Sequence, residues 1–275
     1  MTKFDFEIVG KIGSMALIRK EEGEIDYNVF SRIGSELRPG VIWVSSGAVE
    51  IGRLDYIKRN GRELIGHKED VMTDYSAQGQ AILLSEYRRF IPAQYSVRQL
   101  LVEHTHFNDD EKREHIKRFL QRSAAQNAIP IINYNDPVSI EENRRWELNT
   151  LKKEHGYAVE CIDNDETASV ICMLVKSMYL VLFTSVDGIY RDANDPNTLV
   201  DAVEGKNALE VLGGIEELQK SCVGASREGA NGARSKLDFI KGPIEQGTTV
   251  IITNGQNRLT DAISGNCRRT IFRVR

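Results

Sequence analysis

The stretch IPIINYNDPVS, residues 129–139, joins a continuous apolar run to a cluster of asparagine and aspartate. The run shows no alternation of apolar and polar residues, which is typical of a parallel strand covered on both faces by helices. Comparable runs recur along the chain, and segments with helical spacing separate them. We expect strands at residues 6–12, 41–44, 96–102, 129–133, 179–183, 249–253 and 271–274. This order predicts an α/β fold of three layers with a mainly parallel central sheet.

Helical spacing is clearest over residues 77–90 and 109–126, and a late segment, 228–246, is interrupted by Gly242-Pro243. The chain has 275 residues, which favours one domain with two lobes over two separate domains. We expect residues 1–165 to form the first lobe. Residues 166–275 would form a second lobe that continues the same sheet.

The charge balance argues against a nucleic-acid partner, because 36 Lys and Arg stand against 40 Asp and Glu. Arg268, Arg269, Arg273 and Arg275 form a basic tail, but apolar residues alternate with them, which favours an edge strand over a binding arm. No CxxC pair, signal peptide or apolar run of about 20 residues is present. These features predict reduced thiols, a cytoplasmic location and no membrane insertion.

In sheets of this kind, ligands bind beyond the carboxyl ends of the strands. The loop after the first strand contains Lys11, Gly13 and Ser14. Glycine allows backbone N–H groups to approach a phosphate, and a lysine can neutralise charge on a transferring phosphoryl group. A solvated surface lysine is an equally good interpretation of Lys11 by itself. The full P-loop pattern is absent.

Two further loops follow the strands at 41–44 and 129–133. In VSSGAVEIGR, two serines and a glycine precede a helical segment, whose first N–H groups could bind an anion; Ser45 or Ser46 could instead only cap the helix. In INYNDP, Asn133, Asn135 and Asp136 could bind a ligand or form an Asx turn.

The segment CIDNDETAS, residues 161–169, places Asp163, Asn164 and Asp165 at the start of an apolar helix. Two aspartates exceed what capping requires, so we expect a site that orients cations or ammonium groups. The last motif is split between residues 182–196 and GANGARSK, residues 229–236. The second part resembles a phosphate-cradling loop that ends in Lys236, although a solvated helix face is the alternative for Lys236.

In this order, the five motifs resemble the amino-acid-kinase family, and VSSGA, INYND, DND and TSVDGIY look like its glutamate 5-kinases. The resemblance implies an α/β/α sandwich, an acceptor site in the first lobe, an ATP site in the second lobe, and a homo-oligomer. It implies that Lys11 and Lys236 contact phosphate and that Asp165 holds both lysines. The implied acceptor residues are Ser46, Gly47, Asp136 and Asn164. The implied nucleotide residues, besides the two lysines, are Gly13, Ser14, Thr184, Ser185, Asp187, Tyr190, Asn231 and Gly232.

The resemblance also implies a reaction, namely ATP-dependent conversion of L-glutamate to glutamyl 5-phosphate in proline biosynthesis. A carboxylate is ionised at neutral pH and needs no general base, so Lys11, Lys236 and Mg²⁺ carried on the ATP phosphates would stabilise the transfer. No dedicated metal site is expected. The alternatives are a kinase of the same fold for another acid or for a phosphate or phosphonate acceptor, and a non-catalytic nucleotide or metabolite sensor.

The sequence departs from the usual glutamate 5-kinase pattern at several positions. Tyr134 stands in place of a glutamate, Ile162 in place of a glycine and Ser185 in place of an aspartate. The link 137–162 is longer than usual and the loop 229–236 is altered. Tyr134, Ile162 and the link 137–162 predict a reshaped acceptor pocket or an oligomer contact. Ser185 and the loop 229–236 predict a changed nucleotide site. His104 and His106 have no third ligand nearby in the sequence, which argues against a metal site.

Overall fold

The computed structural model describes residues 3–139, 141–161, 163–192, 194–221 and 233–275. The chain divides into two compact units, one made of Met1–Ile12 with Asp165–Arg275 and the other of Gly13–Asn164. The first twelve residues, expected in the first lobe, therefore group with the C-terminal part. The reason is strand pairing, because β1 (Phe6–Ile12) runs parallel to β7 (Ser177–Thr184), with Ile12 opposite Phe183.

The unit Gly13–Asn164 contains three parallel strands in the order β5-β6-β4. They are β4 (Val41–Ser45), β5 (Ser96–Val102) and β6 (Ala128–Tyr134), and β2 (Ile18–Arg19) and β3 (Glu24–Ile25) form a separate hairpin. The helices are η1 (Ser14–Leu17), α1 (Tyr27–Gly34), α2 (Ala48–Asn60), α3 (Lys68–Phe90), α4 (His104–Asn108), α5 (Asp110–Ala125), η2 (Asp136–Val138) and α6 (Glu141–His155).

The other unit contributes five strands in the order β1-β7-β9-β10-β8. Besides β1 and β7 these are β8 (Ala202–Gly205), β9 (Thr249–Asn254) and β10 (Arg269–Val274). The helices are η3 (Pro196–Thr198), α8 (Ala208–Ser221), α9 (Ala233–Phe239), α10 (Lys241–Glu245) and α11 (Leu259–Ser264), together with α7 (Asn164–Val175), which begins at the last residue of the other unit.

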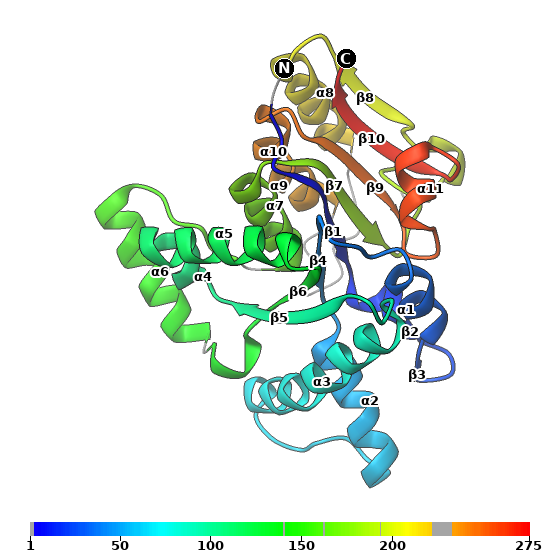
Figure 1. The fold of residues 1–275 in the computed structure, drawn as a ribbon, viewed down its shortest axis with the longest axis vertical. Helices are drawn as coiled ribbons and strands as arrows, with labels where there is room; N and C mark the ends of the chain where they lie inside the picture. The colour runs from blue at the N-terminus through cyan, green and yellow to red at the C-terminus, as the bar shows by residue number, and fades with distance from the viewer. Residues whose placement is uncertain (1–2, 140, 162, 193, 222–232) are drawn as a thin grey trace. The chain divides into compact units, whose positions relative to one another are not determined.

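The expected fold class is confirmed, because eight mostly parallel strands make up the central sheet and helices flank them (Figure 1). Every residue of β4 and β6 is buried, as a strand covered on both faces requires. Within each unit, α5 packs on β6, while α8 packs on β8 and β10.

The strand β10 differs from its expected position. It is a strand, but it lies between β9 and β8 rather than at the edge of the sheet, and it runs antiparallel to β9. The edge is the short β8, which has no apolar run to reveal it in the sequence. Its Glu204 accepts a hydrogen bond of 2.7 Å from Arg273 Nε and also pairs with Arg275, so it neutralises part of the basic tail.

Two expected helices also differ in extent. The helix expected at 77–90 begins nine residues earlier, at Lys68, and its first turn carries Glu69 and Asp70, which the helix dipole favours. The late segment forms two short helices, α9 and α10, since Pro243 lacks the N–H that a continuous helix would use. Residues 228–232 of that segment lie outside the described residues.

The crossing of α2 and α3 depends on two glycines. A Cβ on Gly52 would lie 1.8 Å from the backbone oxygen of Tyr75, and a Cβ on Gly79 would lie 1.8 Å from that of Ala48. No side chain fits in that space, so the helices approach backbone to backbone. This approach sets the rotation of α3 and buries its polar residues Ser76 and Gln80.

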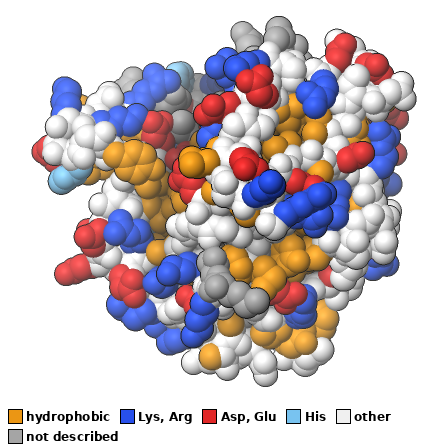
Figure 2. Space-filling view, turned by 90° about the horizontal axis from the view of Figure 1, so that it is seen from above, with side chains coloured by type: hydrophobic (Ala, Val, Ile, Leu, Met, Phe, Trp, Pro, Cys, Tyr) orange, Lys and Arg blue, Asp and Glu red, His pale blue; other side chains and the backbone are white. Residues whose placement is uncertain are grey.

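Charged side chains are mixed on the surface that Figure 2 shows, where lysine and arginine are interspersed with aspartate and glutamate. The described residues of that face therefore form no extended patch of one sign. In the described part of the chain, no helix combines the length and the apolar character needed to cross a membrane.

A buried hydrogen-bonded group fixes β4 against α3. The indole N–H of Trp43 donates to the Tyr87 hydroxyl at 2.8 Å, and Ser45 Oγ lies 2.9 Å from the same hydroxyl. Trp43 and Tyr87 are fully buried, and the ring of Phe30 meets that of Tyr87 edge to face at 4.9 Å. The hydroxyl of Tyr87 therefore satisfies an indole N–H that water does not reach.

Replacing Tyr87 by phenylalanine is expected to lower the free energy of unfolding by about 1–3 kcal/mol, because it removes the buried hydroxyl that accepts the hydrogen bond of the Trp43 N–H. The thermal midpoint measures this loss. Tyr27→Phe is the control, because Tyr27 is exposed and its midpoint should stay at the wild-type value. Equal midpoints for the two variants would mean that the indole N–H has another acceptor.

Candidate active site

Three charged residues form a compact cluster in the unit that contains β1. Lys11 lies near the end of β1, Asp165 in the first turn of α7 and Lys236 in α9. Lys11 Nζ is 2.7 Å from Asp165 Oδ1, and Lys236 Nζ contacts Asp165 Oδ2. One carboxylate thus bridges two ammonium groups, and the three residues carry one net positive charge.

The burial of this cluster decides between the interpretations of Lys11. Its side chain is 8% exposed and that of Asp165 is 4% exposed, whereas Lys236 is 23% exposed. The surface interpretation of Lys11 is therefore wrong. Burial of a lysine is unfavourable without a partner, and Asp165 supplies that partner.

The charges of the two lysines determine the ionisation of Asp165. Burial alone would raise the pKa of Asp165, but the charges and hydrogen bonds of Lys11 and Lys236 outweigh it and hold the pKa at about 2. Asp165 is therefore ionised throughout the neutral range. A carboxylate that is ionised and already engaged with two cations is suited to positioning them and not to accepting a proton.

The loop after β7 lies at the same edge of the sheet as Lys11, since Lys11 and Ile12 pair with Leu182 and Phe183. Thr184 closes this loop, because its hydroxyl donates to the Val186 carbonyl at 2.8 Å and accepts from the Val186 N–H at 3.1 Å. Ser185, beside it, is exposed.

Asp187 is the centre of a second group of contacts in that loop. Its carboxylate accepts hydrogen bonds from Asn254 Nδ2 at 3.1 Å and from the Tyr190 hydroxyl at 3.4 Å. Arg268 Nη1 lies 3.2 Å from the same carboxylate. Asp187 and Tyr190, two of the residues expected to line a nucleotide, thus contact each other, and Thr184 lies at the start of the same loop. Asn231 and Gly232 lie outside the described residues.

The unit Gly13–Asn164 holds a network of amides at the carboxyl ends of its strands. Asn164 Nδ2 donates to Ser46 Oγ at 3.0 Å and to Asn133 Oδ1 at 2.9 Å, while Asn133 Nδ2 donates to Gln80 Oε1 at 2.7 Å. The backbone N–H of Tyr134 also donates to Asn133 Oδ1 at 2.9 Å, which fixes that atom as an acceptor. Asn164 must therefore present its NH₂ group to it.

This orientation leaves the other atom of the Asn164 amide without a partner. Asn164 Oδ1 is buried and accepts no hydrogen bond from the described residues. A buried carbonyl oxygen with no donor is unfavourable, so a ligand that supplied an N–H would satisfy it.

Gly47 brings two expected site segments close together. It precedes α2 with a φ of 109°, a left-handed conformation that favours glycine. A Cβ at this position would lie 3.0 Å from Leu17 Cδ1 and 3.8 Å from the Cα of Ser14. The turn Ser46-Gly47 therefore lies against the segment that begins with Gly13 and Ser14.

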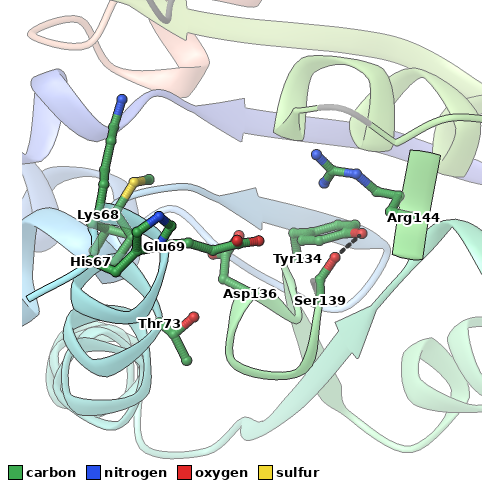
Figure 3. A pocket seen from close by; sticks show the side chains of 10 residues that line it. His67, Lys68, Glu69, Thr73, Tyr134, Asp136, Ser139 and Arg144 are labelled. Atoms are coloured by element: carbon green, nitrogen blue, oxygen red, sulfur yellow. Dashed lines mark hydrogen bonds between the residues drawn. The ribbon is translucent and has the colours of Figure 1, made fainter. Parts of the chain in front are cut away.

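A cavity of about 450 Å³ lies in the same unit, and Tyr134, the residue after Asn133, is part of its wall (Figure 3). Its lining comes from α2, from the start of α3, from the end of β6 and the segment after it, and from α6: Val49, His67, Lys68, Glu69, Met72, Thr73, Tyr134, Asp136, Ser139 and Arg144. Asp136 Oδ2 accepts a hydrogen bond from Ser76 at 3.2 Å. Burial raises the pKa of Asp136, and the Ser76 hydrogen bond and the charge of Arg144 act against that rise.

Several residues of these clusters escaped the sequence analysis, notably Ser76, Gln80 and Arg144. Ser76 and Gln80 stand four residues apart and are 1% and 7% exposed, so one face of α3 presents them to the site. That spacing, beside Gly79, is a signal in the sequence, but the helix expected at 77–90 begins after Ser76 and so does not include the pair. Arg144 lies in the link 137–162, which carries no motif.

His104 and His106 make local contacts. His104 Nε2 lies 2.8 Å from Glu147 Oε2, and His106 Nδ1 accepts a hydrogen bond of 2.8 Å from the Glu103 N–H in a capping box at the start of α4. Within the described parts of the chain, no group of three or more His, Cys, Asp or Glu residues is arranged to hold a metal ion.

The sheet, its flanking helices and the charged groups at the strand ends define a protein of the α/β/α sandwich class. The chain belongs to the Amino acid kinase family, whose sequence model matches residues 7–254. It is 30% identical over 278 aligned positions to a glutamate 5-kinase of Alkaliphilus metalliredigens (strain QYMF), an alignment that covers 98% of this chain and 96% of that protein.

Solved structures share the fold at low identity. The carbamate kinase of Giardia lamblia bound to AMP-PNP superposes with a TM-score of 0.58 at 15% identity, covering 98% of this chain and 99% of that one. A UMP kinase of Ureaplasma parvum gives a TM-score of 0.54 at 13% identity, covering 98% of this chain and all of the other (100%).

Proposed function

We propose that this protein is an ATP-dependent kinase that phosphorylates the side-chain carboxylate of L-glutamate and releases glutamyl 5-phosphate and ADP. The observation that carries the proposal is the buried Asp165 carboxylate that bridges Lys11 and Lys236. The resemblance to a glutamate 5-kinase over nearly the whole chain supports the acceptor. The AMP-PNP complex of the carbamate kinase supports ATP as the donor.

The acceptor needs no general base in this reaction. A side-chain carboxylate with a pKa of about 4.3 is ionised at neutral pH. One of its oxygens attacks the γ-phosphorus of ATP, the bond from that phosphorus to the β–γ bridging oxygen breaks, and ADP leaves with the electron pair. No proton moves, so a positioned base would add nothing.

The remaining obstacle to the reaction is the electrostatic repulsion between the acceptor carboxylate and the γ-phosphate of ATP, and the two lysines would reduce it. Lys11 and Lys236 would contact the phosphates and stabilise negative charge as it develops on the transferring group and on ADP. Asp165 holds both ammonium groups from one side. We assign Asp165 to positioning and not to proton transfer, because its pKa of about 2 keeps it ionised.

The nucleotide would bind in the unit that contains these lysines. The loop after β7 would line it through Thr184, Ser185, Asp187 and Tyr190. The family resemblance assigns the same role to Gly13 and Ser14, which belong to the unit Gly13–Asn164, and to Asn231 and Gly232, which lie outside the described residues. The net positive charge of the lysine cluster fits a polyphosphate and not a free metal ion. Mg²⁺ carried on the ATP phosphates would neutralise part of their charge.

The acceptor would bind in the unit Gly13–Asn164 through Ser46, Gly47, Asp136 and Asn164. The Asp136 carboxylate and Asn164 Oδ1, which has no donor among the described residues, are both acceptors, which suits an ammonium group. A phosphate or phosphonate acceptor has no ammonium group, and Asp136 would repel its negative charge. These groups therefore favour an amino acid over a phosphate acceptor.

A coupled assay of ADP release tests the proposal with glutamate, aspartate, N-acetylglutamate, glutarate, carbamate, UMP and a phosphonate. We expect glutamate to give the highest kcat/KM and hydroxylamine to trap its product as the hydroxamate. Highest turnover with UMP or the phosphonate would establish the phosphate-acceptor alternative. Tight ATP binding by calorimetry without turnover of any compound would establish a sensor.

Replacing Asp136 by asparagine is expected to raise the KM for glutamate about 10- to 100-fold, because a charged hydrogen bond to the ammonium group is lost. Asparagine keeps the size and can still accept from Ser76. The KM for glutarate, which lacks the ammonium group, should change little and serves as the internal control. Because burial raises the pKa of Asp136, protonation as the pH falls should weaken glutamate binding in the wild type but not in the variant. Equal losses for glutamate and glutarate would contradict the ammonium contact.

A further inference from the structure

We propose that Arg144 binds a second carboxylate of the acceptor and so makes the site selective for amino acids that carry two carboxylates. The inference rests on the proposed function and concerns the cavity beside Asp136. Arg144 comes from α6, within the link 137–162, and lines that cavity.

The position of Arg144 depends on an aromatic side chain. Its guanidinium lies over the ring of Tyr134, with Cζ 5.8 Å from the ring centroid, in the geometry of a cation–π contact. The ring is itself fixed, because Tyr134 is 5% exposed and its hydroxyl lies 2.9 Å from Ser139 Oγ. Figure 3 shows Arg144 extending from α6 above Tyr134, with the start of α3 on the opposite side of the cavity.

The guanidinium is available to a ligand. Among the described residues, no side chain forms an ion pair or a hydrogen bond with the guanidinium of Arg144, and a cation–π contact occupies the face of the guanidinium and not its N–H donors. A glutamate at position 134 would pair with this arginine and neutralise it. Tyrosine at that position holds the guanidinium in place without neutralising it.

The charges on the cavity wall suit a zwitterion. Asp136 and Glu69 bring negative charge, while Arg144 and Lys68 bring positive charge. The charge of Arg144 reaches Asp136, because it opposes the rise that burial causes in the pKa of that carboxyl group. A ligand bound by both residues therefore needs a carboxylate and an ammonium group close together, as on the α-carbon of an amino acid.

A carboxylate that is bound by Arg144 is not the one that accepts the phosphoryl group. If Arg144 binds one carboxylate, phosphoryl transfer requires another, so the acceptor has two carboxylates. An arginine offers a planar fork of donors that matches a carboxylate with two parallel hydrogen bonds. Acids that lack the α-carboxylate should therefore be poor substrates.

The test compares glutamate with 4-aminobutanoate, which keeps the reacting carboxylate and the ammonium group but lacks the α-carboxylate. Arg144→Gln should raise the KM for glutamate about 10- to 100-fold with little change in kcat or in the KM for ATP. The kcat/KM for 4-aminobutanoate, already low, should stay within about twofold of the wild type. Arg144→Lys should recover only part of the loss, since lysine keeps the charge but loses the fork.

Arg145→Gln is the matched control, because Arg145 is the next residue of α6, is exposed and does not line the cavity. It should behave as the wild type with both acids. Calorimetric titration with glutamate in the absence of ATP gives a readout independent of turnover. There, Arg144→Gln should weaken binding and Arg145→Gln should not.

The outcomes separate this inference from the proposed function. Glutamate turnover and binding that do not depend on Arg144 would overturn the inference and leave the proposed function standing. Glutamate binding that depends on Arg144 without turnover would support the inference and overturn the kinase assignment. Equal losses for glutamate and 4-aminobutanoate in Arg144→Gln would also overturn the inference, because they would show a general defect of the site.

Discussion

Replacing Lys11 by methionine is expected to lower kcat by at least about a hundredfold, because it removes a cation aimed at the charge that develops during phosphoryl transfer. Methionine has nearly the length of lysine and is apolar, so it suits a position that is 6% exposed. Lys236→Met should have an effect of the same order. Initial rates of ADP release at saturating ATP and glutamate measure both.

The burial of Lys11 determines what else to expect of the variant. A solvated lysine could be removed without consequence for folding, but Lys11 is enclosed and paired with Asp165. Asp165 keeps Lys236 as a partner in the methionine variant, so the fold should persist. Lys11→Ala would add a cavity and should be less stable than Lys11→Met. Lys58→Met, at an exposed position on α2, is the control and should match the wild type. A kcat within tenfold of the wild type in Lys11→Met would remove Lys11 from the mechanism.

The strands of the sheet could be predicted from the sequence where burial is complete. The limits of β1 and β5 were predicted to the residue, and those of β4, β6, β7 and β9 to within two residues at each end. A parallel strand covered by helices on both faces must be apolar throughout, so the pattern is unambiguous. The short edge strand β8, AVEG, has no such constraint, and its absence from the prediction misplaced β10 at the edge.

The rule that ligands bind beyond the carboxyl ends of parallel strands also identified most residues of the candidate site. Lys11, Asp165 and Lys236 meet although they lie far apart in the sequence, and Asn164 meets Ser46 in the other unit. The rule identifies residues at the ends of strands and says nothing of the helices that pack beside them. Gln80 of α3 contacts Asn133 because of the close crossing at Gly52 and Gly79, and that crossing is a long-range property of the fold.

The environment of a single residue was hardest to predict from the sequence where the same residue type occurs both at the surface and in a binding site. A lysine near the end of a strand can be solvated or buried. Lys11 is buried because β1 pairs with β7 and because Asp165 approaches its ammonium group. Arg144 poses the same difficulty on a helix of strongly polar sequence, EENRRWELNTLKKEH. Its orientation follows from the ring of Tyr134, ten residues earlier in the chain.

Replacing Asp165 by asparagine is expected to lower kcat at least tenfold and to destabilise the protein when no nucleotide is bound. Asparagine can still accept hydrogen bonds from N–H groups at the start of α7, so a residue that served only to stabilise the helix start would tolerate the change. The substitution instead removes the negative charge that separates two ammonium groups. The buried ammonium group of Lys11 then lies near the ammonium group of Lys236 without the carboxylate that paired with both. Removing one partner of a buried ion pair costs about 3–5 kcal/mol, and the partial exposure of Lys236 places the expected loss at the lower end, about 3 kcal/mol.

Two measurements distinguish this effect from a general defect of folding. ATP with Mg²⁺ brings negative charge to the same two lysines, so it should raise the thermal midpoint more in Asp165→Asn than in the wild type. The KM for ATP should not rise, while kcat falls because the lysines are no longer held in one position. A variant with normal turnover and a normal midpoint would restore the capping interpretation of Asp165.

The pH dependence of stability gives an independent test of the same cluster. The pKa of Asp165 is about 2 in the folded protein, below the value of about 3.9 for an unfolded aspartate. A depressed pKa stabilises the folded state at pH values above the unfolded pKa, and that stabilisation is lost as the pH falls through about 4 toward 2. Denaturant unfolding should therefore show wild type and Asp165→Asn differing by a constant amount from pH 7 to about 5. Below about pH 4 the two curves should converge, because protonation of Asp165 removes the same charge that the substitution removes. A difference that stayed constant down to pH 3 would mean that the charge of Asp165 does not stabilise the two lysines.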